Sequence, residues 1–439
     1  MGTSFFILTT LIKITESYKY NYNLPYICVK FKLQCPKNFK PAYHVLFILN
    51  RIKPFVGKNI IKVFRGQRRV GKSYLLFQLI HEIRENNPEA AIIYINKEDL
   101  AFSAIKNAED LNTYVLEHKA EKEKTYVFID EIQDIENFEA ALRSLVLDQH
   151  LDLYCTGSNA HLLSGDIAGH LSGRFIEIEV YSLCYEEFLV FHQLEDRSQN
   201  VEKYLKFGGL PYLLHLPLID EVVFEYLKNI YTTILFRDVV NRFGLRNTVF
   251  LEQLVAFLAS NTGSIFSAKK ISDFLKSQKI NMAPNQVQLY IQHLVNAFLI
   301  HQVKRYDIVG KRLFEIGEKY YFENLGIRNS LWGYRPEDRG KIMENAVCNH
   351  LLVQGFTVEV GILGENEIDF IAEKNGEKIY IQVALTINEE KTMEREFGNL
   401  QKIKDNYPKM VVTMDKFSGN TFEGIMTIDL RSFLTNKWK

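Results

Sequence analysis

The sequence predicts an α/β protein, in which a parallel sheet with helices on both faces is followed by a helical region and a smaller α/β unit. From Ile60 onward, short apolar runs alternate with amphipathic stretches, which is typical of a parallel sheet covered by helices. The chain has 439 residues, 47% hydrophobic and 24% charged. A chain of this length and composition is globular and holds roughly two to four compact units.

Five apolar runs are the predicted strands of the first unit. The runs at 60–64, 91–95, 126–129 and 151–155 are continuously apolar, so we expect central strands buried on both faces. The run at 175–180 alternates apolar residues with Glu177 and Glu179, which predicts a half-exposed edge strand and the end of the sheet.

Bulk properties exclude several classes of protein. Basic and acidic residues balance at 53 each, so the chain lacks the strong positive field of a nonspecific nucleic-acid binder. Its five cysteines are odd in number and scattered, which indicates a reducing, cytoplasmic compartment. No apolar run reaches the roughly 18 residues that cross a bilayer, so we expect no membrane association. Residues 1–44 form an N-terminal extension to which we assign no role.

The strongest motif lies between the first predicted strand and the first predicted helix. Backbone N–H groups of such a glycine-containing loop cradle phosphates, the motif lysine reaches the β- and γ-phosphates, and the final hydroxyl ligates Mg²⁺. The motif therefore predicts ATP and Mg²⁺ as ligands, within an ATPase unit at 45–182. The segment fits G-x-x-x-x-G-K-S/T and reads Gly66, Gln67, Arg68, Arg69, Val70, Gly71, Lys72, Ser73.

Two acids, Asp130 and Glu131, follow the predicted strand at 126–129. In open α/β sheets, ligands bind at the carboxyl ends of the strands. Asp130 would hold Mg²⁺ together with Ser73, and Glu131 would polarise the attacking water, so the pair predicts hydrolysis rather than nucleotide storage. The alternative is an Asp-Glu turn that only caps the following helix.

These motifs resemble the AAA-type P-loop ATPases, in the prokaryotic group whose ATPase is fused to a C-terminal domain of unknown function. The resemblance runs from about residue 45 to the end of the chain. Thr156-Gly157-Ser158-Asn159 matches the family's Thr-Gly-Ser element, which implies that Ser158 or Asn159 senses the γ-phosphate or the attacking water.

Three further elements are similar to those of the same family. Leu171-Ser172-Gly173-Arg174 matches its Leu-x-Gly-Arg element and implies that Arg174 is an arginine finger or sensor, acting within one subunit or between subunits. A surface ion pair with Glu177 is the alternative. Gly208-Gly209-Leu210-Pro211 and Arg237-Asp238 match the central segment of the family, but their residues suggest no chemistry.

The middle of the chain is predicted to be helical, with a lid or linker at 183–250 and a winged-helix-like unit at 251–335. Between 264 and 305, six basic side chains stand against the single acid Asp273. This local charge is compatible with DNA binding, while packing as a lid or against a protein is the alternative. The basic side chains are Lys269, Lys270, Lys276, Lys279, Lys304 and Arg305, and the second predicted helix adds the polar Asn285, Gln286, Gln288, Gln292 and His293.

The last unit, at 336–439, carries Glu344 on a predicted helix, Asp369 at the start of a predicted strand and Gln382 on the next strand, an arrangement that resembles the restriction endonucleases. Glu344, Asp369 and Gln382 match the acidic positions and would surround a hard metal ion. The lysine that completes the motif is Ala384 here, and Lys378 lies roughly 20 Å away along the strand. We therefore expect a degenerate, inactive nuclease-like unit that serves interaction.

Together these observations predict a Mg²⁺-dependent ATPase that couples its nucleotide state to a partner through its C-terminal units. Two alternatives stay open. One is a nucleotide-gated protein that binds or cleaves DNA, and the other is a nucleotide-switched scaffold without significant turnover. A protein partner and a homo-oligomer are compatible with each of them.

Overall fold

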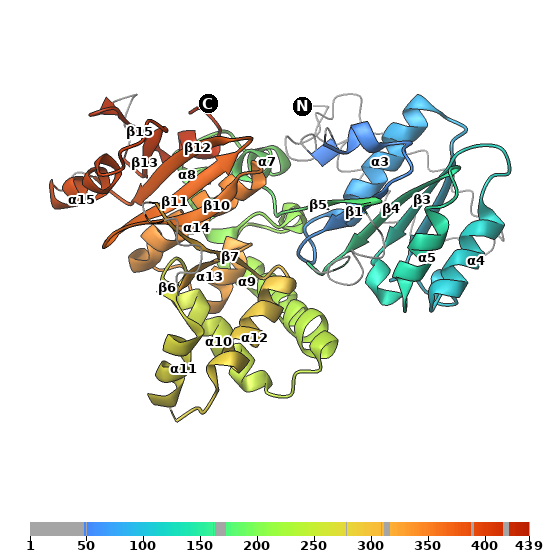
Figure 1. Cartoon of the computed structure of the whole chain (residues 1–439), viewed down its shortest axis with the longest axis horizontal. Helices are drawn as coiled ribbons and strands as arrows, with labels where there is room; N and C mark the ends of the chain where they lie inside the picture. The colour runs from blue at the N-terminus through green and yellow to red at the C-terminus, as the bar shows by residue number, and fades with distance from the viewer. Residues whose placement is uncertain are drawn as a thin grey trace.

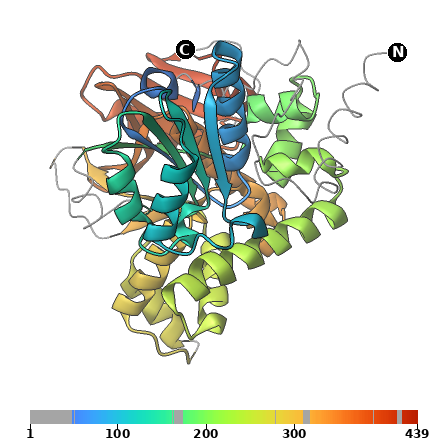
Figure 2. The same cartoon turned by 90° about the vertical axis from the view of Figure 1, so that its right-hand side faces the viewer.

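The computed structural model describes residues 48–49, 51–160, 162, 173–277, 279–308, 310, 317–387, 390–415 and 421–438. The extension expected at 1–44 lies outside these ranges. The described residues build sheets of five, seven and three strands, connected by helices (Figures 1 and 2). Figure 1 shows the five-stranded sheet and the seven-stranded sheet on opposite sides of the molecule, with the helices of residues 248–296 below them.

The five-stranded sheet is entirely parallel, with the order β2-β3-β4-β1-β5. The edge position predicted for β5 is confirmed. The central position predicted for 91–95 is wrong, because β2 forms the opposite edge. The run is apolar because helices cover both faces of the sheet at β2, and this property does not depend on whether a strand has one neighbour or two. The strands are β1 (Ile61–Arg65), β2 (Ala91–Asn96), β3 (Thr125–Asp130), β4 (Leu151–Gly157) and β5 (Phe175–Glu179).

Helices cover both faces of this sheet, as predicted. Helix α3 (Lys72–Asn86) buries Leu75, Leu76, Leu79 and Ile83 against one face. Helices α4 (Ala108–His118) and α5 (Phe138–Leu145) pack on the other face. The loops after β1, β3 and β4 consequently meet along one edge of the sheet. Short 3-10 turns complete the unit: η1 (Lys53–Phe55), η2 (Leu100–Phe102) and η3 (Ile132–Asp134).

The segment after β5 is helical, as predicted, and breaks at the Gly208-Gly209 pair. Gly208 has a φ of +72°, and a Cβ on Gly209 would lie 2.1 Å from the Leu183 carbonyl oxygen, so both positions require glycine. Within the described ranges, none of the helices has the length and apolar character needed to span a bilayer. The elements are α7 (Tyr185–Phe191), α8 (Ser198–Phe207), η4 (Pro211–His215), α9 (Asp220–Thr233), the π-helix η5 (Ile234–Asn241) and α10 (Thr248–Ser260).

A small antiparallel sheet with the order β6-β9-β7 follows α10. Helices α11 (Ala268–Ser277) and α12 (Pro284–Asn296) lie between its first two strands in the sequence and share the core of α10. The strands are β6 (Ile265–Phe266), β7 (Ile300–Val303) and β9 (Glu318–Phe322). Strand β8 (Arg305–Asp307) leaves this unit and pairs with the last sheet.

The last sheet has seven strands in the order β14-β15-β13-β12-β11-β10-β8. The strands predicted near 356–360, 368–372, 379–384 and 410–413 are confirmed as β10 to β13. Helices α14 and α15 contribute to separate clusters on the two faces of this sheet. The elements are α13 (Leu325–Trp332), η6 (Pro336–Asp338), α14 (Arg339–Val353), β10 (Thr357–Leu363), β11 (Asn366–Lys374), β12 (Glu377–Ala384), α15 (Glu390–Gln401), β13 (Lys409–Thr413), β14 (Thr421–Phe422), β15 (Ile425–Asp429) and α16 (Leu430–Leu434).

Candidate nucleotide-binding site

The glycine-containing loop connects the carboxyl end of β1 to the amino end of α3. A Cβ on Gly66 would lie 2.1 Å from the Val180 carbonyl oxygen, so only glycine fits beside the end of β5. Gly71, the N-cap of α3, has a φ of +101°, which favours glycine. The loop therefore turns tightly into a helix N-terminus, where backbone N–H groups and the helix dipole favour an anion.

Lys72 is buried inside this loop. Its Nζ donates hydrogen bonds to the carbonyl oxygens of Gly66 at 3.0 Å and Gln67 at 2.9 Å. Burial lowers the pKa of Lys72, and the nearby Glu131 carboxylate opposes that effect. The ammonium is thus held at the loop, next to the acids that follow β3.

Asp130 ends β3 and faces the first turn of α3. Its carboxylate accepts hydrogen bonds from the Ser73 and Thr156 hydroxyls, and from the Tyr94 hydroxyl at 3.1 Å. Burial raises the pKa of Asp130, while the hydroxyl donors oppose the shift.

The oxygens of Ser73 and Asp130 are adjacent and suit a hard cation such as Mg²⁺. Among the described residues, no group of three or more His, Cys, Asp or Glu side chains could hold a metal ion. A Mg²⁺ site of this kind needs no such group, because Mg²⁺ keeps several waters and uses one or two protein ligands plus substrate phosphates. The residues therefore fit Mg²⁺.

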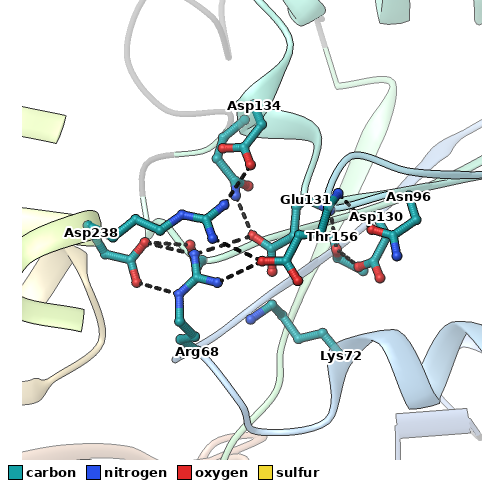
Figure 3. Close-up of polar contacts among 12 residues, drawn as sticks. Arg68, Lys72, Asn96, Asp130, Glu131, Asp134, Thr156 and Asp238 are labelled. Carbon is teal, nitrogen blue, oxygen red and sulfur yellow. Dashed lines mark hydrogen bonds and ion pairs between the residues drawn. The ribbon is translucent and has the colours of Figure 1, made fainter. Parts of the chain in front are cut away.

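Glu131 follows Asp130 with a φ of +56° and a ψ of +51°, a strained backbone for a side chain of this size. Its N–H donates to Thr156 Oγ1 at 2.9 Å, and its carboxylate accepts a hydrogen bond from Gln133. Burial alone would raise the pKa of Glu131, but the charges of Lys72 and Arg68 outweigh burial and lower it. Figure 3 shows Glu131 between Arg68, Lys72 and Asp130. The geometry therefore holds an ionised carboxylate at the edge where phosphates would lie.

Ser158 and Asn159 lie directly after β4, at the same edge of the sheet. Ser158 is fully buried, and its Oγ donates to Asp238 Oδ1 at 3.3 Å. The fold thus places Ser158 at the same sheet edge as the loop motif, and the sensing role implied for Ser158 or Asn159 stays a prediction.

Two of the remaining side chains of the loop, those of Gln67 and Val70, contact the protein. Gln67 Nε2 donates to the Phe298 carbonyl oxygen at 2.9 Å, and Val70 is part of the core. Arg69 is exposed, with a φ of +71°. For Gln67 and Val70, only the backbone is therefore available to a phosphate, whereas the Arg69 side chain is open to solvent.

Arg68 makes the contact that the sequence did not reveal. Its guanidinium is buried and pairs with both oxygens of Asp238, at 3.0 Å from Nε and 3.1 Å from Nη2 (Figure 3). A further contact of 3.1 Å joins Nη1 to Glu98. Asp238 belongs to the Arg237-Asp238 pair, which was noted in the sequence without an assigned chemistry. The ion pair therefore brings the π-helix η5 into direct contact with the loop.

Arg174 lies away from this site in its own chain. It is exposed and directly precedes β5, whose first residue pairs with the first residue of β1. The loop motif lies at the other end of these strands, roughly 16 Å away by strand rise. Within its own chain Arg174 therefore lies away from the loop motif, and its role as an arginine finger or sensor stays a prediction. Leu171 and Ser172 of the same element lie outside the described residues.

The acids of the last unit meet around a lysine from outside that unit. Lys319, on β9, contacts Glu344 at 2.7 Å, Glu367 at 2.6 Å and Asp369 at 3.3 Å. An ammonium that the sequence analysis did not identify thus reaches these acids from the neighbouring sheet, while the expectation of an inactive nuclease-like unit stays a prediction. Gln382 accepts a hydrogen bond from the Asp369 N–H at 2.6 Å. Burial raises the pKa of Glu344 to about 7, against the opposing charge of Lys319.

Some of the basic and polar side chains predicted to form a surface on the middle unit are exposed, and others are buried or half-buried. Exposed lysines lie along α11 and just after it, next to the exposed amino end of α12. His293, however, is buried against Phe243 with ring centroids 3.8 Å apart, and Gln292 is half-buried and bonded to Asn296. These two side chains do not belong to the polar surface predicted for α12. The exposed residues are Lys269, Lys270, Lys276, Lys279, Asn285, Gln286 and Gln288.

Comparisons with known proteins cover most of the chain. Residues 58–189 match an AAA domain, and residues 198–338 match a domain of unknown function, DUF8612. An uncharacterized protein of Haemophilus influenzae is 35% identical over 387 residues, which are 87% of this chain and 95% of that protein. An uncharacterized protein of Methanocaldococcus jannaschii is 30% identical over 368 residues, 79% of each chain.

Solved structures show weaker likeness. The ORC2 protein of Aeropyrum pernix is 12% identical with a TM-score of 0.34, covering 71% of this chain and 92% of that chain. AMPPCP-bound DnaA of Aquifex aeolicus is 15% identical with a TM-score of 0.28, covering 49% and 74%. The fold assignment rests on the parallel strand order and the AAA-domain match rather than on these structures.

Proposed function

Because this chain belongs to one family with the uncharacterized Haemophilus influenzae protein and matches an AAA domain at residues 58–189, we propose that it binds ATP and hydrolyses it with Mg²⁺. One observation carries the proposal: Lys72, Ser73, Asp130 and Glu131 converge at one edge of the parallel sheet. A loop that only bound phosphate would not need an ionised glutamate beside the lysine.

Each of these residues has a definite part in the reaction. The loop N–H groups and Lys72 bind the phosphates, and Ser73 and Asp130 would hold Mg²⁺, which neutralises phosphate charge. Glu131 accepts a proton from water as the water attacks the γ-phosphorus. The bond between that phosphorus and the β–γ bridging oxygen breaks, which gives ADP and inorganic phosphate. Ser158 donates a hydrogen bond to the γ-phosphate or to the water.

The purified protein should release phosphate from ATP in the presence of Mg²⁺ and should lose this activity when EDTA removes the metal. Oxygen ligands such as Ser73 and Asp130 bind hard cations, so Mg²⁺ or Mn²⁺ should restore turnover, while Zn²⁺ should not. Colorimetric detection of phosphate checks this. Turnover that is equal in EDTA and in Mg²⁺ would contradict the assignment of Ser73 and Asp130.

The remaining parts of the chain are proposed to pass the nucleotide state to a partner. Residues 45–182 would be the ATPase unit, 183–250 the lid, 251–335 a winged-helix-like unit and 336–439 an interaction unit. Contacts support coupling, because the loop residue Gln67 donates a hydrogen bond to the carbonyl oxygen of Phe298, just after α12.

Lys319 occupies the centre of the acidic cluster at Glu344 and Asp369, so we propose no nuclease activity there. In an oligomer, Arg174 would act on a neighbouring subunit.

A second candidate function is DNA binding by the middle unit. Helices α10 to α12 with the sheet β6-β9-β7 favour a winged-helix-like arrangement. Four exposed lysines lie on and after α11, and three exposed amide side chains lie on α12, which packs against α11. Lysines contact phosphates and amides contact base edges, so the pair of helices offers both kinds of group.

Replacing these four lysines together by glutamate should abolish DNA binding. Contacts with about four phosphates predict that log K falls with log salt concentration with a slope of roughly −3.6, because bound counterions are released. Fluorescence anisotropy with a duplex at several salt concentrations measures the slope. A fourfold reversal of exposed lysines outside this unit is the matched control. Binding that survives the first reversal would place the contact elsewhere. The lysines to reverse are Lys269, Lys270, Lys276 and Lys279, and those of the control are Lys53, Lys58, Lys122 and Lys404.

A further inference from the structure

The carboxylate of Asp238 is the centre of a buried contact between the lid and the candidate nucleotide site. Asp238 is only 1% exposed and lies in the π-helix η5, between α9 and α10. π-helical turns are rare and frequently occur at functional sites. Here the π-helix places the carboxylate of Asp238 against Arg68, in the loop that begins at Gly66.

Every side chain that Asp238 contacts is one that a phosphate could also use. Arg68 Nε and Nη2 bind its two oxygens at 3.0 and 3.1 Å, and Ser158 Oγ donates to Oδ1 at 3.3 Å. Arg242 Nη2 lies 3.7 Å from the same oxygen. Within the described part of the chain, the buried Nη1 of Arg242 has no hydrogen-bond partner. Two guanidinium groups and the Ser158 hydroxyl therefore surround one carboxylate.

We infer that Asp238 holds the position of the γ-phosphate, so that ATP displaces it and releases η5 from the loop, whereas ADP leaves the contact in place. The inference rests on the proposed ATP binding and adds its regulation. A phosphate oxygen can accept the same hydrogen bonds from Arg68 and Ser158 that the carboxylate accepts now. Two anions cannot share these donors, because like charges in close contact repel each other.

Discrimination between ATP and ADP follows from this competition. ADP ends at the β-phosphate, which the loop N–H groups and Lys72 bind, so it does not reach Ser158 and Arg68. Only the third phosphate competes with Asp238. A ligand shifts an equilibrium only by its differential affinity for the two states, and here the γ-phosphate supplies that difference.

The released segment is connected to the units that would contact a partner. η5 leads into α10, whose buried residues share a core with α11 and α12. Arg237 adds exposed contacts of 3.0 Å to Glu98 and 2.8 Å to Asp134, which hold η5 on the same edge of the sheet. Exposed ion pairs of this kind stabilise a contact only weakly, so loss of the buried Asp238 contact would loosen the start of the helical unit on the ATPase unit.

Two measurements on the full chain test the inference. Hydrogen exchange followed by mass spectrometry should show faster exchange in 234–242 with Mg²⁺ and the nonhydrolysable analogue AMPPNP than with Mg²⁺ and ADP. Calorimetry of Asp238→Asn should show AMPPNP binding tightened about tenfold and ADP affinity unchanged, because the amide keeps the volume but loses the competing charge. Asp220→Asn, which removes an acid of α9 that pairs with Lys206 instead, should change neither affinity.

The outcomes separate this inference from the proposed function. If wild-type protein binds neither nucleotide, the proposed function fails and this inference fails with it. If both nucleotides bind but exchange in 234–242 is equal with AMPPNP and ADP, only the inference is overturned. Equal effects of Asp238→Asn on the two affinities would also overturn it. The exchange experiment uses wild-type protein, so the test does not depend on the folding of the variant.

Discussion

Glu131→Gln should bind ATP with wild-type affinity and hydrolyse it about 10²- to 10⁴-fold more slowly, the range for loss of a positioned general base. The carboxylate is ionised, because the charges of Lys72 and Arg68 lower its pKa despite burial. A glutamine amide has nearly the same shape, and its oxygen still accepts the hydrogen bond from Gln133. It cannot accept a proton from water, so binding and turnover should separate.

Calorimetry with Mg-ATP and phosphate release together check this separation. Glu136→Gln is the matched control, because Glu136 is an exposed glutamate five residues further along the chain. The control should keep both affinity and turnover. Wild-type turnover in Glu131→Gln would leave the carboxylate a structural role only, in stabilising the turn after β3. A loss of affinity equal to the loss of turnover would instead indicate a damaged phosphate site.

The left-handed backbone conformation of Glu131 decides which substitution is suitable for this experiment. A left-handed conformation costs of order 1–3 kcal/mol for a residue other than glycine. The hydrogen bond from its N–H to Thr156 helps to hold that conformation, and the bond does not involve the carboxylate. Removing the charge should therefore leave the turn intact, which is why the amide variant is preferable to alanine.

The parts of the site that could be predicted from the sequence are those whose residues lie close together along the chain. The loop from Gly66 to Ser73 is contiguous, and its spacing predicted a strand, a turn and a helix that the structure contains. The acids Asp130 and Glu131 were identifiable for a similar reason, because they directly follow an apolar strand. In both cases the chemistry and the secondary structure are encoded within about ten residues of each other.

Contacts between distant segments left no such signal. Arg68 and Asp238 are 170 residues apart, so nothing in the local pattern of either residue indicates the other. Lys319 reaches Glu344 and Asp369 from a strand of another sheet, and a search along the strand that carries Ala384 could not find it. The position of β2 at the edge has the same cause, because strand order is set by tertiary packing.

Lys72→Ala should weaken ATP binding by about 3 kcal/mol, which is roughly a 100-fold increase in Kd. The ammonium is held within the loop by two carbonyl oxygens, those of Gly66 and Gln67. It is therefore placed to contact the β- and γ-phosphates with little loss of conformational entropy. Each hydrogen bond to a charged group contributes about 1.5–3 kcal/mol, so the loss of two such contacts sets the expected size.

A second variant separates binding from folding, because Lys72→Ala also leaves an empty volume at a buried position. Lys72→Met removes the ammonium and its hydrogen bonds as well but keeps most of the side-chain volume, so it should retain the thermal stability of the fold better than Lys72→Ala while losing ATP to the same degree. Lys53→Ala, at an exposed lysine of the same unit, is the control and should bind ATP normally. Calorimetry with Mg-ATP measures all three variants, and circular dichroism confirms that each is folded. Unchanged affinity in folded Lys72→Met would show that the nucleotide does not bind at the loop from Gly66 to Ser73, and the roles derived for Ser73, Asp130 and Glu131 would then fail together.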